Sequence, residues 1–208
     1  METVLKILVA CEESQRVTIE LRRLGHEAYS CDIEPPSGGR PEWHIQGDVL
    51  PLLSQRWDMI IAFPPCTYLS NAGACRLYPR KGELDINRYH KGLAAKEFFL
   101  KFLNADCPRI AVENPVSSRI FEMPPHTQEI QPYMFGHPYT KKTRLWLKGL
   151  PPLTPTQLVE PIGPYIPAGT GRKDHTKYGA AKKDSKSRSK TFIGIAKAMA
   201  EQWTNERK

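Results

Sequence analysis

Apolar and polar positions along the chain form short apolar runs that alternate with longer segments of helical spacing. Continuous β-favouring runs predict strands, and apolar residues that recur every three or four positions predict helices. The expected strands are 4–10, 27–32, 44–47, 58–63, 109–112 and 143–147, and the expected helices are 14–24, 87–104 and 192–203. Strands that alternate with helices predict an α/β fold with a mostly parallel sheet and helices on both faces.

Polar side chains follow the expected strands, where each strand ends. In open α/β sheets, ligands bind beyond the carboxyl ends of the strands. The residues expected at this edge are Cys11, Glu12, Asp32, Glu34, Asp48, Cys66 and Glu113. Packing alone does not explain such a gathering, so the sequence predicts a ligand site at this edge.

The tetrapeptide Phe63-Pro64-Pro65-Cys66 follows the apolar run 59–62 and presents a thiol after a stiff turn. Proline fixes φ and removes a backbone donor, so the residue after two prolines has a restricted direction. Cys66 is therefore a candidate nucleophile, the alternative being a small buried apolar residue. A Pro-Pro turn is also compatible with methylation of an amino group, but that chemistry favours an aromatic residue at position 66.

The turn after the first strand, residues 10–14, contains two glutamates and no G-x-G-x-x-G pattern. Phosphates favour glycines and a free helix N-terminus, so this turn argues against a dinucleotide. Glu12 and its neighbour are compatible with a sulfonium ligand that carries an ammonium group, or they favour the helix dipole. Asp32 or Glu34 can accept the two ribose hydroxyls and Asp48 an adenine amino group. Together they fit S-adenosylmethionine better than NAD or ATP.

A thiol and a carboxyl group at neighbouring strand ends indicate pyrimidine chemistry. Addition of Cys66 to carbon 6 of cytosine makes carbon 5 nucleophilic, while Glu113 holds a proton at nitrogen 3. Arg144 is expected to hold the carbonyl oxygen of the base or to lower the pKa of the thiol.

These motifs resemble those of the cytosine-5 DNA methyltransferases. Phe63-Pro64-Pro65-Cys66 is similar to the nucleophile loop of that family, and Val112-Glu113-Asn114-Pro115 to its Glu-Asn-Val motif. Lys142-Thr143-Arg144 resembles the Gln-x-Arg-x-Arg motif, and 192–196, with Gly194, the last helix that completes the cofactor site. Residues 25–28, 46–49 and 131–138 resemble the short phage and prophage type.

The resemblance implies a Rossmann-like class I methyltransferase fold, S-adenosylmethionine as the methyl donor and methylation of carbon 5 of cytosine in DNA. It places the catalytic roles at Cys66, Glu113 and Arg144. Cofactor contacts are expected from Cys11, Glu12, Asp32, Glu34, Asp48, Pro64 and Gly194. Substrate contacts are expected from Asn114, Ser70, Arg76, Lys142, Arg172 and Lys173.

The chain also departs from the family pattern. Its first motif is not glycine-rich, Pro115 replaces the usual valine, and the stretch after Trp146 is too short for the usual target-recognition domain. We therefore expect little sequence discrimination. We expect three parts along the chain. Residues 1–150 form a catalytic and cofactor-binding domain, residues 151–190 a basic Pro/Gly-rich segment in place of a target-recognition domain, and residues 191–208 a C-terminal helix that packs back on the catalytic domain.

Charge and cysteine content refine this picture. The formal net charge is +8, and 170–190 holds eight basic residues against two acids, which predicts contact with nucleic acid. A target base must be flipped out of a duplex or already be single-stranded. Five cysteines without C-x-x-C spacing predict neither disulfides nor a metal site and favour a reducing bacterial cytoplasm. No membrane-spanning segment is expected.

Two alternatives remain open. The first is modification of a free pyrimidine nucleotide, which the missing recognition domain favours. The second is a non-catalytic DNA-binding or anti-defence protein, which the basic segment favours.

Overall fold

The computed structural model describes residues 3–74, 76–165 and 188–205. Seven strands form one sheet in the order β3-β2-β1-β4-β5-β7-β6. The strands are β1 (Lys6–Ala10), β2 (Glu27–Asp32), β3 (His44–Gln46), β4 (Met59–Ala62), β5 (Ile110–Pro115), β6 (Gln128–Ile130) and β7 (Thr143–Lys148). Strands β1 to β5 pair in parallel, whereas β7 is antiparallel to both β5 and β6.

This strand order, with an antiparallel β7 beside β5, is that of the Rossmann-like class I methyltransferase fold. The expected fold class is thereby confirmed. Because β1 to β5 all run in one direction, their carboxyl ends lie along one edge of the sheet. The candidate residues that follow these strands are gathered there, as expected for a ligand site in an open α/β sheet.

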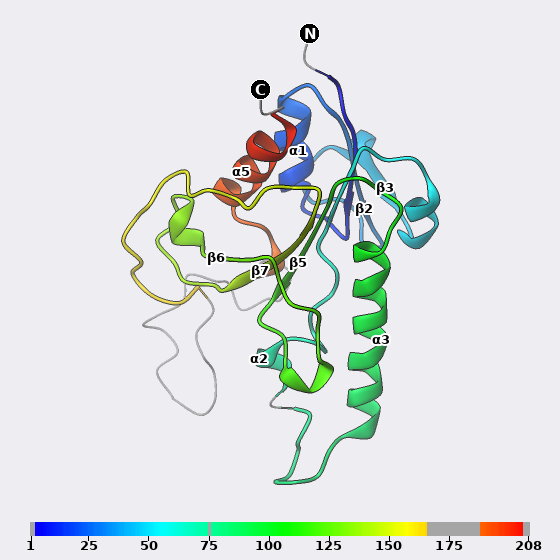
Figure 1. The fold of residues 1–208 in the computed structure, drawn as a ribbon, viewed down its shortest axis with the longest axis vertical. Coiled ribbons are helices and arrows are strands. Elements are labelled where there is room, and N and C mark those ends of the chain that lie inside the picture. Colours follow the sequence, from blue (N-terminus) through cyan, green and yellow to red (C-terminus); the bar gives the residue numbers. More distant parts are fainter. Residues whose placement is uncertain (1–2, 75, 166–187, 206–208) are drawn as a thin grey trace.

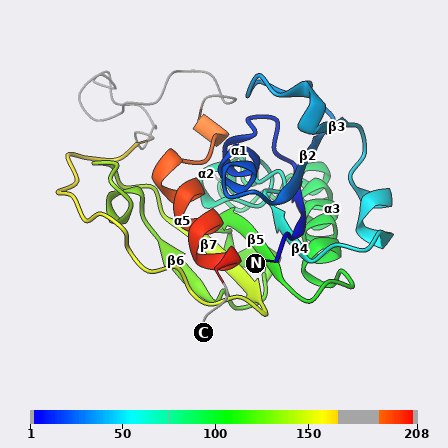
Figure 2. The same ribbon diagram turned by 90° about the horizontal axis from the view of Figure 1, so that it is seen from above.

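Helices cover both faces of the sheet (Figures 1 and 2). The helices are α1 (Arg16–Arg23), α2 (Asn71–Ala74), α3 (Ile86–Leu103) and α5 (Ile193–Thr204). Helices α1 and α5 pack together on one face, and α3 packs against the other. The core therefore has two apolar layers, one on each side of the strands.

Alternation along the strands divides their side chains between these layers. In β1, Ile7 and Val9 belong to the layer beneath α1 and α5, whereas Leu8 belongs to the layer beneath α3. In β5, Ala111 and Val112 divide in the same way. The same alternation decides which of the polar residues at the strand ends can meet.

The predicted strands and helices are confirmed, with shifts at their ends. The sequence prediction missed β6 and ended β5 at Val112, whereas the strand continues to Pro115. Three residues of β6 give too little pattern to recognise. Short 3-10 helices, which the prediction also lacked, are Pro41–Trp43, Leu50–Ser54, Arg119–Phe121 and Pro132–Met134.

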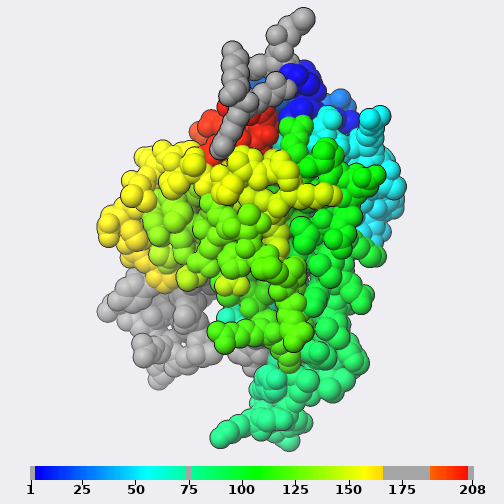
Figure 3. Space-filling model, viewed as in Figure 1, coloured from blue at the N-terminus to red at the C-terminus, as the bar shows by residue number. Residues whose placement is uncertain are grey.

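Asp85 immediately precedes helix α3, and its side chain accepts a hydrogen bond from the backbone N–H of Arg88 at 2.9 Å. This is the N-cap arrangement that satisfies a free donor of the first turn. The first turns of α3, with α2 and the loop between them, project from the body of the molecule (Figures 1 and 3). Within the described residues, no helix has the length and apolar character needed to span a membrane.

Candidate active site

The turn after β4 positions the thiol of Cys66. The backbone N–H of Phe63 donates to the carbonyl of Ala10 at 2.9 Å, which keeps the chain in register with β1. The carbonyl of Cys66 accepts the N–H groups of Leu69 at 3.1 Å and Ser70 at 2.9 Å. Pro64, expected at the cofactor, is buried in this turn. Its lack of a backbone donor leaves no N–H to satisfy there.

Glu113 lies beside Cys66, because β5 is the neighbour of β4 in the sheet. Burial, followed by the negative charge of Glu113, raises the pKa of the Cys66 thiol to about 11. Burial also raises the pKa of Glu113. The structure therefore brings together the two groups in which the sequence predicted the chemistry, and both of them favour the protonated form.

Lys141 is the positively charged residue near Cys66 and Glu113, and the sequence prediction missed it. The positive charge of Lys141 lowers the pKa values of both Cys66 and Glu113, against the larger effect of burial. Its Nζ donates to the carbonyl of Arg188 at 3.1 Å and lies 5.9 Å from the ring centre of Phe192. The signal was weak, because Lys141 is one of two adjacent lysines and precedes the segment that resembles the arginine motif.

Arg144, expected in this role, does not join the pair. It lies opposite Asn114 in the β5–β7 register, one position along from Glu113, so it faces the other side of the sheet. Its Nε lies 3.5 Å from Glu129 Oε2, and Nζ of Lys142 lies 3.3 Å from Glu129 Oε1. Arg144 and Lys142 thus both form ion pairs with Glu129, which belongs to β6. The structure thus does not bring Arg144 together with Cys66 and Glu113, and its catalytic role stays a prediction.

The expected substrate residues are dispersed. Asn114 is fully buried, and its side-chain amide has no hydrogen-bond partner among the described residues. Ser70 is buried and forms a bridge with Ser117, so it supports the turn that carries the thiol. Arg76 is exposed beyond α2. Neither Asn114 nor Ser70 offers a surface for a substrate, and Arg172 and Lys173 lie outside the described residues.

The carboxyl ends of β1, β2 and β3 gather a second group of residues. Burial raises the pKa of Cys11 strongly, and the nearby charges of Asp32 and Asp48 add to the increase. Asp32 Oδ1 accepts the N–H of Glu34 at 3.0 Å, and Asp48 Oδ1 accepts that of Leu50 at 3.0 Å. Among the described residues, neither aspartate has a hydrogen-bond partner at its Oδ2. Glu34, the other acid expected at the ribose, is exposed.

Glu12 caps helix α1 from within the protein. Its carboxylate accepts the backbone N–H groups of Val17 at 2.7 Å and Thr18 at 3.3 Å, and the Thr18 hydroxyl at 2.8 Å. Burial raises the pKa of Glu12 to about 7. These three hydrogen bonds give Glu12 a structural role as a helix cap, and its expected contact with a cofactor stays a prediction. A phosphate has no free helix N-terminus to bind at this turn.

The first turn adopts backbone conformations for which glycine is favoured. Cys11 and Gln15 have φ values of 58° and 56°, in the left-handed region. The side chain of Gln15 stabilises this turn, because it donates to the carbonyl of Arg40 at 2.7 Å and accepts the N–H of Arg40 at 3.1 Å. Side-chain hydrogen bonds thus tie the loop after β2 to the turn, in a place where the sequence lacks glycines.

Gly194 packs against protein. Its N–H donates to His137 Nε2 at 2.9 Å, and an added Cβ would lie 1.8 Å from the carbonyl oxygen of Phe135. The residue is glycine because the start of α5 approaches this backbone closely. These contacts within the fold account for the glycine, and the expected cofactor contact of Gly194 stays a prediction.

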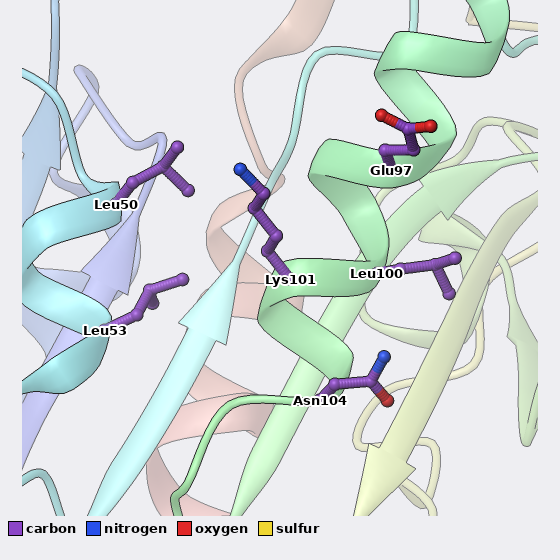
Figure 4. A pocket seen from close by; sticks show the side chains of 6 residues that line it. All are labelled: Leu50, Leu53, Glu97, Leu100, Lys101 and Asn104. Atoms are coloured by element: carbon purple, nitrogen blue, oxygen red, sulfur yellow. The ribbon is translucent and has the colours of Figure 1, made fainter.

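An apolar groove lies away from these groups, between the Leu50–Ser54 helix and α3 (Figure 4). It is a shallow, open depression of about 530 Å³ lined by Leu50, Leu53, Glu97, Leu100, Lys101 and Asn104. Asn104 follows α3 and precedes the amino end of β5, so the groove is on the side away from Cys66. Among the described residues, no group of His, Cys, Asp or Glu side chains has the arrangement of a metal site.

Comparison with known proteins adds little to this picture. No protein-family model matches the sequence, and the curated proteins contain no match. Among solved structures, an rRNA methylase from Escherichia coli is similar at a TM-score of 0.37 and 16% identity. The similarity covers 70% of this chain and 57% of the methylase, so the chain spans little more than half of that protein. The fold assignment rests on the strand order described above.

Proposed function

We propose that this protein transfers a methyl group from S-adenosylmethionine to carbon 5 of cytosine in DNA. The observation that carries the proposal is the pairing of Cys66 with Glu113 at the carboxyl ends of β4 and β5, beside Lys141. A thiol next to a carboxyl group of raised pKa suits a reaction in which a pyrimidine ring gains a nucleophile at carbon 6 and a proton at nitrogen 3.

The proton balance follows from the two raised pKa values. The protonated Glu113 carboxyl group donates its proton to nitrogen 3, and it takes up the proton that the Cys66 thiol releases as sulfur forms a bond to carbon 6. Carbon 5 of the ring thereby becomes nucleophilic. Lys141 stabilises the negative charge that moves between the two side chains. After methyl transfer, a base takes the carbon 5 proton and the thiolate departs from carbon 6. The proton on nitrogen 3 then returns through Glu113 to the sulfur, which restores the pair to its starting state.

The residues at the ends of β1 to β3 fit the methyl donor. Asp32 suits the ribose hydroxyls and Asp48 the adenine amino group, because a carboxylate offers acceptor oxygens and no donor, and the charges of both acids act on Cys11 at the same end of the sheet. S-adenosylmethionine supplies a methyl group on a positively charged sulfur. The internal cap by Glu12 leaves no site for a competing phosphate at the first turn.

Mass spectrometry of nucleosides tests the proposal directly. Duplex DNA, single-stranded DNA and dCMP are each incubated with the protein and S-adenosylmethionine, then digested and analysed. We expect 5-methylcytosine in DNA and none with Cys66→Ala. Cys107→Ala, which removes another buried thiol on the α3 side, is the matched control and should retain activity. Methylation of dCMP alone would favour the nucleotide alternative, and an active Cys66→Ala would exclude the mechanism.

A further inference from the structure

Residues 188–192 connect the thiol side of the site with the first turn after β1. On one side, Lys141 donates to the carbonyl of Arg188. On the other, Arg16 donates to the carbonyl of Thr191, and Lys190 Nζ donates to Ser37 Oγ at 2.8 Å. Residues 188–192 therefore place Lys190 near the turn that follows β1, at the end of the site where Cys11 lies.

Glu13 is the acid that meets this lysine. Both carboxylate oxygens of Glu13 are inaccessible to solvent, and neither has a hydrogen-bond partner among the described residues. Nζ of Lys190 lies 3.8 Å from Glu13 Oε1, which is beyond hydrogen-bond reach. Glu12, one residue earlier, instead accepts three hydrogen bonds. A buried carboxylate with this little compensation is costly and favours a better cationic partner.

We propose that Glu13 binds the α-ammonium group of an amino-acid-bearing ligand and that Lys190 is the counter-ion which this ammonium replaces. An α-ammonium group offers three donors and can bond both oxygens of Glu13, whereas the Lys190 ammonium donates to Ser37 and lies beyond hydrogen-bond reach of Oε1. The ligand is S-adenosylmethionine, and to that extent the subsite rests on the proposed function. Its position agrees with this, because Glu13 is two residues from Cys11, which lies beside Asp32 and Asp48.

The test compares two thioether nucleosides by isothermal titration calorimetry. S-adenosylhomocysteine carries the amino-acid group, whereas 5′-methylthioadenosine has the same adenosine and sulfur without it. We expect wild-type protein to bind S-adenosylhomocysteine more tightly. Glu13→Gln should weaken that binding about tenfold, as loss of a charged hydrogen bond does, and leave methylthioadenosine unchanged. Lys190→Met should strengthen binding of S-adenosylhomocysteine, because the competing cation is gone.

Glu42→Gln is the matched control, since it removes the same charge from an exposed acid that pairs with Arg40. It should change neither affinity. A Glu13→Gln variant that weakens both ligands equally, or neither, overturns the subsite. Equal affinity of wild-type protein for the two ligands overturns it without any variant and leaves the methyltransferase proposal intact. Binding of neither ligand overturns the cofactor assignment together with the subsite.

Discussion

The carboxyl group of Glu113 lies close enough to the thiol of Cys66 for its negative charge to raise the pKa of that thiol, while Lys141 acts in the opposite direction. Cys66 therefore rests as a protonated thiol near neutral pH. The arrangement keeps the sulfur unreactive until a cytosine ring is bound, because nitrogen 3 of the ring can then take up a proton. It also makes the reactivity of Cys66 a direct measure of the two neighbouring charges.

Alkylation of Cys66 by iodoacetamide at pH 8 should be faster in Glu113→Gln and slower in Lys141→Met. Removal of the carboxylate lowers the pKa of the thiol, and removal of the ammonium raises it. A change of one pKa unit alters the thiolate fraction about tenfold, and the opposing change in nucleophilicity reduces the net effect to about threefold. Mass spectrometry of the Cys66 peptide follows the rate. Glu129→Gln, an acid paired with Arg144 and Lys142, should not alter it. The same rate in all variants would show that the three groups are not coupled.

Lys141→Met should reduce kcat for methyl transfer by about a hundredfold, within the range for a positioned electrostatic group. Lys142→Met is the matched comparison, because it removes the adjacent lysine, which is 63% exposed and paired with Glu129. We expect its smaller loss to appear in KM. Steady-state kinetics with DNA separates these effects. A larger loss of kcat in Lys142→Met or Arg144→Met than in Lys141→Met would assign the catalytic positive charge to the Lys142-Thr143-Arg144 segment instead of to Lys141.

The fold and the central pair follow from the sequence, because they depend on local signals. Apolar runs indicate the strands, and a Pro-Pro turn before Cys66 indicates where the thiol lies. The sequence prediction is less informative where the role of a residue depends on the direction of its side chain. Arg144 and Asn114 resemble a motif in sequence, yet alternation along β7 and β5 points both away from Glu113. Glu12 and Glu13 are neighbours of the same type. Only the three-dimensional contacts show that Glu12 caps a helix, whereas the carboxylate of Glu13 has no hydrogen-bond partner among the described residues.

Gly194→Ala should destabilise the fold by about 1–3 kcal/mol, the usual cost of overpacking. The added Cβ would meet the carbonyl oxygen of Phe135, which is backbone and cannot rotate away. Thermal unfolding should therefore show a midpoint several degrees lower than that of the wild type. Ile193→Ala, at the exposed first residue of α5, should leave the midpoint nearly unchanged. Full thermal stability of Gly194→Ala combined with a loss of S-adenosylhomocysteine binding would support the cofactor contact that the sequence suggested.

Glu12 should make the stability of the protein fall as pH rises from about 4.5 to about 7. Burial raises its pKa to about 7 in the folded state, from 4.5 when unfolded. The folded state therefore binds more protons in this window, and unfolding becomes easier as pH increases. The difference in pKa corresponds to on the order of 3 kcal/mol, present below pH 4.5 and lost above pH 7. Urea unfolding at pH 5 and pH 8 measures the loss. It should be smaller in Glu12→Gln, which keeps one acceptor oxygen for Val17 and does not ionise, whereas Glu42→Gln should behave like the wild type. An equal loss in Glu12→Gln and the wild type would assign the pH dependence to another group.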